Sequence, residues 1–276
     1  MKFGVTFPYI ESKVTADLAA EAEAAGWDGI FVWDTIWGID AWITLTAVAL
    51  QTTRVTLGVL LTPLSRRKPW EVASQTATLD RLSGGRLVFP VGLGAPETGW
   101  ANFGEETDRK IRAERMDEGL DILTGLWKGQ PFNYTGKYYQ IKETSFMPPP
   151  PPLQQPRIPV WVVGAWPSEK SMQRVIKYDG LLPMKMENGA ASPHFTPDDI
   201  RAMRAYIEER RKLTTPFDII VEGETPGDQP EQAAKQARQW ADAGVTWWQE
   251  DVWAKVYETR GVEGIRQRLK QGPPRG

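Results

Sequence analysis

Short stretches of dense apolar, β-branched or aromatic residues recur along the whole chain. Within them the apolar positions are nearly continuous and do not alternate with polar ones, which is typical of strands that are covered on both faces. The pattern therefore predicts eight buried strands. They span residues 2–7, 28–33, 54–62, 85–91, 158–163, 179–184, 217–223 and 245–250.

Between the predicted strands, apolar residues recur at helical spacing, and several of these stretches stop at a glycine, as helices commonly do. Eight alternations of strand and helix in about 270 residues predict the α/β class and a closed (β/α)8 barrel, a TIM barrel. An open, doubly wound sheet in two domains is the competing architecture. The expected helices span residues 16–25, 41–51, 70–82, 111–128, 168–177, 197–212, 232–243 and 262–271.

Residues 128–157 interrupt the alternation between the fourth helix and the fifth strand. This stretch contains five consecutive prolines, Pro148–Pro152, and is also compatible with a domain boundary or a polyproline ligand. Because TIM barrels tolerate insertions of this length, we interpret residues 130–157 as a proline-rich insertion. The chain is then expected to form a single domain over residues 1–276.

The segment Thr78–Gly94 ends in Gly-Leu-Gly and raises the question of a dinucleotide-binding turn. Such a turn needs G-x-G-x-x-G directly before a helix. Here Gly92 and Gly94 are followed by Ala-Pro-Glu and a loop, so the third glycine is missing. We therefore interpret the segment as a helix, a glycine stop, a strand and a glycine-lined strand exit, the part of a barrel where functional groups gather.

Composition removes several classes of function. The formal net charge is −2 and no block of Lys or Arg stands out, which argues against a nucleic-acid partner. The chain has no cysteine and one histidine, His194, which excludes disulfides, thiol nucleophiles and metal sites built from several Cys or His side chains. No apolar run reaches the roughly 18 residues that a bilayer requires. We expect a cytoplasmic protein without metal or membrane contact.

The segment Leu61–Gly94, LTPLSRRKPWEVASQTATLDRLSGGRLVFPVGLG, resembles the bacterial luciferase-like flavin-dependent oxidoreductases and monooxygenases. Further segments agree with this family in the same order along the chain, so the resemblance covers nearly all of it. They are Gly26–Asp34, Gly119–Ile141, Pro156–Gly164 and Asp179–Pro183.

The resemblance implies a barrel that uses reduced FMN, or alternatively the 8-hydroxy-5-deazaflavin coenzyme, to oxidise or reduce a small-molecule organic substrate. It also implies a homodimer and a separate flavin reductase as partner. Many relatives, particularly deazaflavin users, carry Asp-His after the second strand, whereas this chain has Asp34 and Thr35. This departure favours FMN as the first choice. Members of this family often have a non-prolyl cis peptide bond that packs against the cofactor ring. The corresponding position in this chain is Val59–Leu60.

Candidate site residues lie at the predicted strand exits, where barrels place their functional groups. Three exits carry carboxylates that we expect to be catalytic, Asp34, Glu222 and Glu250. Small residues at other exits would let the flat ring of the cofactor approach the backbone, and aromatic residues would pack around the ring. Backbone N–H groups at the start of a helix would bind the cofactor phosphate. The expected cofactor-binding residues are Phe7, Val59, Leu60, Thr62, Gly92, Gly94, Gly164, Ala165, Trp166 and Ser168.

Other interpretations stay open at this point. Asp34 is alternatively the cap of the second helix. We interpret the run from Arg66 to Lys68 as a solvated loop, with a phosphate clamp as the alternative. A glycosidase-type barrel that uses Glu97 and Glu222 is the first rival function, because two carboxylates across a barrel mouth can hydrolyse a glycoside. A barrel that binds flavin without turnover is the second rival.

Overall fold

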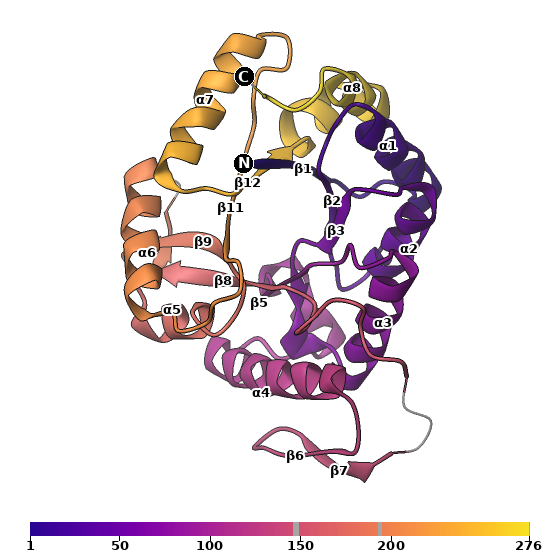
Figure 1. The fold of residues 1–276 in the computed structure, drawn as a ribbon, viewed down its shortest axis with the longest axis vertical. Helices are drawn as coiled ribbons and strands as arrows, with labels where there is room; N and C mark the ends of the chain where they lie inside the picture. Colours follow the sequence, from indigo (N-terminus) through magenta and orange to yellow (C-terminus); the bar gives the residue numbers. More distant parts are fainter. Residues whose placement is uncertain (146–148, 193–194, 276) are drawn as a thin grey trace.

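The computed structural model describes residues 1–145, 149–192 and 195–275. The strands lie inside a ring of helices (Figure 1). Neighbouring strands pair in the order β3-β2-β1-β12-β11-β9-β8-β5-β4, and every pairing along this path is parallel. The strands are β1 Lys2–Phe7, β2 Gly29–Val32, β3 Thr56–Val59, β4 Thr62–Pro63, β5 Phe89–Gly92, β8 Val160–Trp166, β9 Gly180–Glu187, β11 Asp218–Gly223 and β12 Trp247–Asp251, with β10 Ala190–Ala191 antiparallel to β9.

A single parallel bridge closes the sheet. Leu57 of β3 pairs with Leu87 before β5, and the backbone hydrogen bonds from Leu57 to Arg86 and from Val88 to Leu57 are both 2.9 Å long. The predicted (β/α)8 barrel is therefore confirmed, and each of the predicted strands appears. The third predicted strand, residues 54–62, is divided into β3 and β4.

The helices of the described residues follow the predicted ranges closely. Glycine stops end two of them as expected: Gly129 follows α4 with φ +115°, and Gly244 follows α7 with φ +111°. Asp40, and not Asp34, caps the second helix, since its carboxylate accepts hydrogen bonds of 2.9 Å from the N–H groups of Trp42 and Ile43. The helices are α1 Ser12–Ala24, α2 Ala41–Gln51, α3 Pro69–Leu82, α4 Arg109–Lys128, α5 Glu169–Val175, α6 Pro197–Arg210, α7 Pro230–Ala243 and α8 Glu258–Lys270.

Two apolar cores follow from the alternation of side chains along the strands. The larger core lies between the strands and the helices. The smaller core fills the barrel interior, where the rings of Phe31 and Trp161 stack at 5.7 Å and Trp247 packs against both. This core fills the interior, so no channel runs through the barrel. A ligand can bind only at one of its two ends.

The insertion forms its own two-stranded antiparallel sheet, β6 Phe132–Thr135 and β7 Gln140–Thr144, outside the ring of helices (Figure 1). The Glu118 carboxylate of α4 holds the hairpin by accepting hydrogen bonds from three backbone N–H groups of residues 137–139. Asp80 of α3 holds the returning segment, because its carboxylate accepts from the Leu153 N–H at 2.7 Å and from the Gln154 side chain at 2.6 Å. Pro148, the first of the five prolines, and His194 lie outside the described residues.

These contacts generate a prediction about the insertion. Asp80 is fully buried, so Asp80→Ala leaves the N–H donors of residues 153 and 154 without their acceptor. We expect a loss of about 1–3 kcal/mol in the free energy of unfolding, measured by denaturant titration, and faster proteolysis within residues 130–157. Asp242→Ala on the exposed face of α7 is the matched control. An Asp80→Ala protein that is as stable and as protease-resistant as the control would contradict this tether and weaken the single-domain interpretation.

Candidate active site at the mouth of the barrel

A cavity of about 1120 Å³ opens at the carboxyl ends of β2, β5, β8 and β9. This is the end of a (β/α)8 barrel where active sites are found. The volume is large enough for a drug-sized or cofactor-sized ligand. Its apolar wall includes Tyr9, Trp33, Leu60, Leu61, Pro63, Leu93, Trp100, Met116, Val163, Ala165, Met184 and Met186.

Some of the predicted site residues line this cavity and others do not. Those that line it are Asp34, Leu60, Gly92, Gly94, Ala165 and Ser168. Those that do not are Phe7, Val59, Thr62, Gly164, Trp166, Glu222 and Glu250.

Several of these residues do not line the cavity for one physical reason, because a shift of one position along a strand moves a side chain to the opposite face. Phe7 and Val59 are fully buried in the core between strands and helices. A Cβ on Gly164 would meet the side chain of Leu181 at 2.4 Å, so this glycine permits close packing and does not open the cavity. Trp166 packs edge-on against Tyr206 of α6, with the ring centroids 5.8 Å apart. These placements correct the sequence-based expectations.

The non-prolyl cis peptide also lies one residue later than expected. It joins Leu60 and Leu61, and both residues line the cavity. The Ser168 backbone N–H is already donated to the Ala165 carbonyl at 2.8 Å, so it is not free for a phosphate as we expected. The small residues Gly92, Gly94 and Ala165 do line the cavity wall. A Cβ on Gly94 would meet the Trp100 side chain at 2.5 Å, so the packing of Trp100 also requires a glycine at this position.

Asp34 lies at the cavity wall in a double ion pair. Its Oδ1 accepts from Arg66 Nη2 at 3.1 Å and Arg67 Nη2 at 2.7 Å, and its Oδ2 accepts from Arg67 Nε at 2.8 Å. The Asp34 side chain is only 2% exposed, so both oxygens are committed to these guanidinium groups. The interpretation of Arg66 and Arg67 as a solvated loop is therefore wrong, and Asp34 positions the two arginines.

Glu250 is on the wrong face of β12 for a catalytic group at the mouth. It is 2% exposed and pairs with Arg268 of α8 at 3.2 Å. Its oxygens also accept from the Thr225 N–H at 2.8 Å and the Trp248 indole at 3.0 Å. Glu250 thus anchors α8 to the outside of the barrel, and the expectation that it lines the mouth is wrong.

Glu222 faces the barrel interior, as expected for a group at the mouth. It follows Ile220 of the interior core by two residues and lies beside the hydroxyl of Thr6. Its side chain is exposed to solvent, while the protein packed around the carboxyl group removes part of its hydration. This partial desolvation raises the pKa of Glu222 to about 7, and the nearby carboxylate of Asp251 adds to the rise.

Two polar residues beside Glu222 were missed by the sequence analysis, although alternation along β12 places them on the interior face. Gln249 and Asp251 follow Trp247 of the interior core by two and four residues. Burial raises the pKa of Asp251, while a hydrogen bond of 2.8 Å from the Trp253 N–H opposes the rise. Strand alternation could have identified both residues had the register of β12 been known.

An aromatic cluster next to these carboxyl groups was also missed. The rings of Trp33 and Trp253 stack with centroids 4.7 Å apart, and Tyr9 packs edge-on against each of them at 5.7 Å. Burial raises the pKa of Tyr9, and the charge of Asp34 adds to the rise, so its phenol stays a neutral hydrogen-bond donor. The cluster joins the loops after β1, β2 and β12, which no local sequence pattern connects.

Cations gather on the opposite side of the cavity. Arg112 lies over the Trp100 ring at 5.5 Å and donates to the Leu93 carbonyl at 2.7 Å, while its Nε is buried without a partner among the described residues. Arg109, Lys110 and Lys170 line the same cavity and form no ion pair within the described part of the chain. Glu97 and Asp108 line the cavity beside them, so the cavity is apolar at its wall and carries a rim of mixed charge with an excess of cations.

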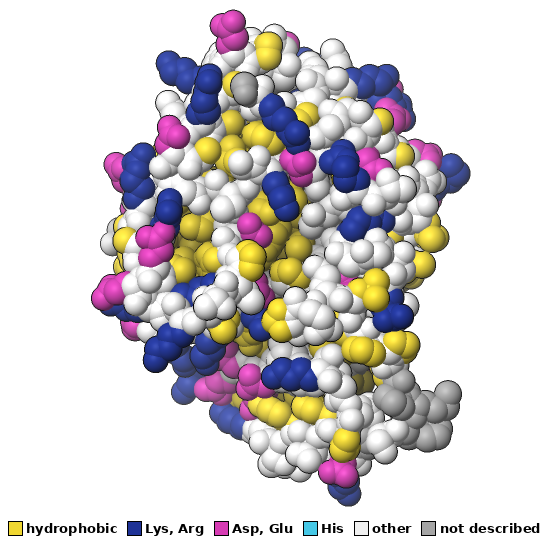
Figure 2. Space-filling model, in the orientation of Figure 1, with side chains coloured by type: hydrophobic (Ala, Val, Ile, Leu, Met, Phe, Trp, Pro, Cys, Tyr) yellow, Lys and Arg dark blue, Asp and Glu magenta, His cyan; other side chains and the backbone are white. Residues whose placement is uncertain are grey.

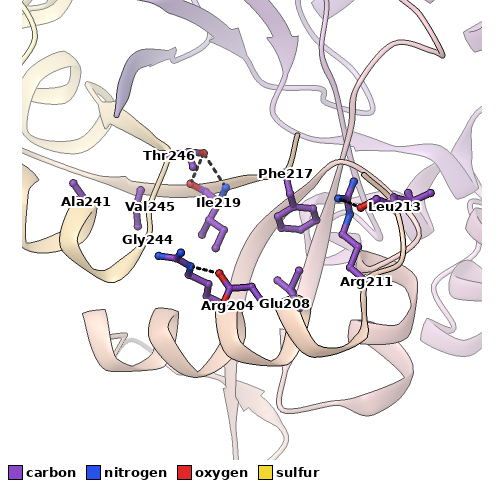
Figure 3. A pocket seen from close by; sticks show the side chains of 11 residues that line it. Arg204, Glu208, Arg211, Leu213, Phe217, Ile219, Ala241, Gly244, Val245 and Thr246 are labelled. Atoms are coloured by element: carbon purple, nitrogen blue, oxygen red, sulfur yellow. Dashed lines mark hydrogen bonds and ion pairs between the residues drawn. The ribbon is translucent and has the colours of Figure 1, made fainter. Parts of the chain in front are cut away.

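A second hollow of about 480 Å³ lies at the amino-terminal ends of β11 and β12, between α6 and α7 (Figure 3). Its charged side chains are already engaged: Arg204 pairs with Glu208 at 2.7 Å, and Arg211 donates to the carbonyls of Leu213 and Thr215. Thr246 bridges to Ile219 in the same view (Figure 3). Because this end of a barrel carries stability more often than chemistry, we assign the hollow a structural role.

The molecular surface adds little to the site. On the face shown in Figure 2, Lys and Arg side chains lie interspersed with Asp and Glu and form no single-sign patch. Among the described residues, no helix is both long and apolar enough to cross a membrane. No group of three or more His, Cys, Asp or Glu side chains is arranged to hold a metal ion in the part of the chain that the structure describes.

Comparison with known proteins identifies relatives of this architecture. An F420-dependent glucose-6-phosphate dehydrogenase of Nakamurella multipartita is 29% identical over 239 residues, which cover 82% of this chain and 67% of that protein. The coenzyme F420-dependent tetrahydromethanopterin reductase of Methanopyrus kandleri superposes with a TM-score of 0.75 at 16% identity, covering 98% of each chain. The oxygenating constituent of 3,6-diketocamphane monooxygenase from Pseudomonas putida, in complex with FMN, has a TM-score of 0.72 at 15% identity, covering 98% of this chain and 96% of that one.

The two structural similarities show a shared fold. The family assignment comes from the sequence, since the family model described as luciferase-like monooxygenase matches residues 6–271. The match covers almost the whole chain and agrees with the segments in which the resemblance was seen. The chain belongs to the luciferase-like monooxygenase family.

Proposed function

We propose that this protein is an oxidoreductase that binds a flavin-type cofactor at the barrel mouth and acts on a small organic substrate. One observation carries the proposal: in a chain of this family, the carboxyl-terminal mouth holds an apolar cavity of about 1120 Å³ with a cationic rim. An isoalloxazine-type ring needs an apolar slot, and its phosphate needs an anion site. The cavity combines both features.

The residues of the cavity fit such a cofactor. Leu60, Leu61, Val163 and Ala165 would hold the faces of the ring, because they form the apolar wall. The buried Nε of Arg112, which has no partner among the described residues, offers a hydrogen bond to a polar edge or to the tail. Arg109, Lys110 and Lys170 would bind the phosphate-bearing tail along the rim.

Both cofactors named by the sequence resemblance remain in the proposal. The curated relatives at 27–29% identity that span most of this chain are named F420-dependent, which supports the deazaflavin coenzyme. The fold is shared with an FMN-bound monooxygenase. We therefore place the deazaflavin coenzyme first, reversing the preference based on Thr35, and keep FMN as the alternative. A separate flavin reductase belongs to the FMN alternative alone.

The bound cofactor would supply the redox chemistry, and the chain supplies binding, orientation and proton handling. Tyr9, Trp33 and the leucines of the wall exclude water from the cavity. Glu222 holds a proton near neutral pH, so it is suited to give a proton to a substrate oxygen or to remove one. Asp34 acts indirectly, because it fixes Arg66 and Arg67 at the wall.

The structure argues against one rival function, the glycosidase, and leaves the other, flavin binding without turnover, open to test. Glu97 lines the large cavity and is exposed, whereas Glu222 lies on the other half of the mouth, so the glycosidase pairing lacks a shared cavity. The family match also favours oxidation and reduction. A barrel that binds flavin without turnover stays a rival, and only a turnover measurement distinguishes it.

The homodimer is proposed on an exposed apolar surface of α2. Ile43 and Leu50 are 68% and 69% exposed and lie seven residues apart on one helix face, and Trp37 before the helix is 83% exposed. Isolated apolar side chains are ordinary, but an aligned group on one face is typical of an interface. We expect a dimer in analytical ultracentrifugation and a monomer for the pair Ile43→Asp and Leu50→Asp. A monomeric wild-type protein would contradict the dimer.

The cofactor proposal has a direct binding test. We expect the purified protein to bind the deazaflavin coenzyme, or FMN in its reduced form, with a Kd below about 1 mM, which corresponds to roughly −4 kcal/mol. Ala165→Phe places a ring in the cavity wall and should weaken binding at least about ten-fold, or by roughly 1.4 kcal/mol. Ala202→Phe on the exposed face of α6 is the control. If neither cofactor binds in titrations followed by fluorescence or heat, the oxidoreductase proposal fails.

The raised pKa of Glu222 predicts how stability depends on pH. Between the ordinary value of 4.5 and about 7, the folded protein keeps a proton that the unfolded chain releases. The protonated group therefore contributes stability below pH 4.5, and this contribution is lost as the pH rises through 7. The quantity compared is the melting temperature of Glu222→Gln minus that of the wild type. We expect this difference to become more positive from pH 4.5 to pH 8. A difference that stays constant with pH would refute the raised pKa.

A further inference from the structure

The barrel mouth has two chemically different halves. The cavity proposed for the cofactor occupies the exits of β2, β3, β5, β8 and β9, while β1, β11 and β12 direct polar side chains to the interior. We infer that this second half, with Glu222, Asp251 and Gln249, is a substrate subsite that accepts an uncharged hydroxyl-bearing organic compound and rejects phosphorylated ones. The inference rests on the proposed function, because it names the substrate class of the same site.

The strand register brings the polar residues together. Glu222 of β11 pairs with Gln249 of β12, and Asp251 of β12 pairs with Thr6 of β1. A Cβ on Gly4 of β1 would meet the Gln249 side chain at 2.2 Å, so Gln249 crosses toward β1 inside the barrel. Three adjacent strands therefore present one continuous polar surface, directly above the apolar core of the interior.

The side chain of Gln249 points to a ligand independently of the carboxyl groups. It is fully buried, yet neither its Oε1 nor its Nε2 has a hydrogen-bond partner among the described residues. Buried amides are almost always hydrogen-bonded, and the hydroxyl of Thr6 on β1 is likewise buried without a partner among the described residues, so both are open to a polar group that reaches this end of the barrel. A hydroxyl satisfies it well, since it both donates and accepts.

The aromatic cluster supplies the apolar contact for the rest of such a molecule. Tyr9 and Trp33 line the large cavity, and Trp253 stacks on Trp33 while its backbone N–H binds Asp251. The cluster thus lies between the cofactor half and the acidic half. A compound with an aromatic or alicyclic body can contact these rings while its hydroxyl reaches the carboxyl groups.

The charges in this half oppose a phosphate group. The loops that follow β1, β2 and β11, residues 8–11, 33–40 and 224–229, contain no Lys or Arg. Arg66 and Arg67 share the carboxylate of Asp34 and are mostly buried, with side chains 8% and 20% exposed. Lys255 after β12 is paired with Glu224 at 2.6 Å. Arg260 lies exposed on α8. Once Glu222 and Asp251 are ionised, a phosphate beside them would meet like charges at short range, which is strongly unfavourable.

A matched pair of probes tests this subsite. Benzyl alcohol and benzyl phosphate share the aromatic body and differ in the group that would face Glu222. The comparison is made with saturating cofactor, so that the cationic rim is occupied. At about pH 8.5, where Glu222 is ionised, we expect benzyl alcohol to bind at least about ten-fold more tightly than benzyl phosphate, as followed by tryptophan fluorescence and by ligand-detected NMR. Glu222→Gln and Asp251→Asn should each lower this preference several-fold, whereas Glu208→Gln at the far end of the barrel should leave it unchanged.

The outcomes separate this inference from the proposed function, because binding is measured and not turnover. Equal binding of the two probes, tighter binding of benzyl phosphate, or no binding of benzyl alcohol up to roughly 50 mM overturns the subsite. So does a preference that survives both carboxylate substitutions. In the same samples, Glu222→Gln and Asp251→Asn should bind the cofactor as wild type does. If the cofactor binds but the probes fail, only the subsite is lost; if the cofactor does not bind, the proposed function fails.

Discussion

Side-chain alternation along a closed parallel sheet is the constraint on which this site depends. Along β12, Trp247, Gln249 and Asp251 face the interior, while Trp248 and Glu250 face the helices. Glu222 and Glu250 both lie near the ends of strands, but their side chains face opposite sides of the sheet. Glu222 reaches the mouth, whereas Glu250 binds Arg268 outside the barrel. The parallel pairings of β12 with β1 and β11 hold this division in place, because they fix which side chains share a face.

Charge pairing then decides what each half of the mouth can bind. Asp34 pairs with two guanidinium groups, so this place in the wall keeps one net positive charge that is held inside the protein by ion pairs. On the cofactor side, the cations of Arg109, Lys110 and Lys170 stay available to an anion. On the side of β11 and β12, carboxyl groups and a buried amide remain. The mouth is thus suited to an anionic cofactor in one half and a neutral substrate in the other.

Much of the fold could be predicted from the sequence, because strands covered on both faces carry nearly continuous apolar runs and helices end at glycines. The site was less predictable for a reason of geometry. An uncertainty of one residue at a strand end, as at Val59 or Gly164, moves the side chain from the mouth to the helix layer. The cluster of Tyr9, Trp33 and Trp253 depends on three loops meeting in space, and no local pattern encodes that meeting.

The central claim is that the cofactor and the substrate occupy different halves of one mouth. The most direct measurement is a crystal structure of the protein with the deazaflavin coenzyme or reduced FMN bound. The account predicts the ring against Leu60, Leu61 and Ala165, with the tail toward Lys110 and Lys170 and with Glu222 facing open space beside the ring. A ring seated against Glu222 and Asp251, or a tail directed away from the cationic rim, would contradict it.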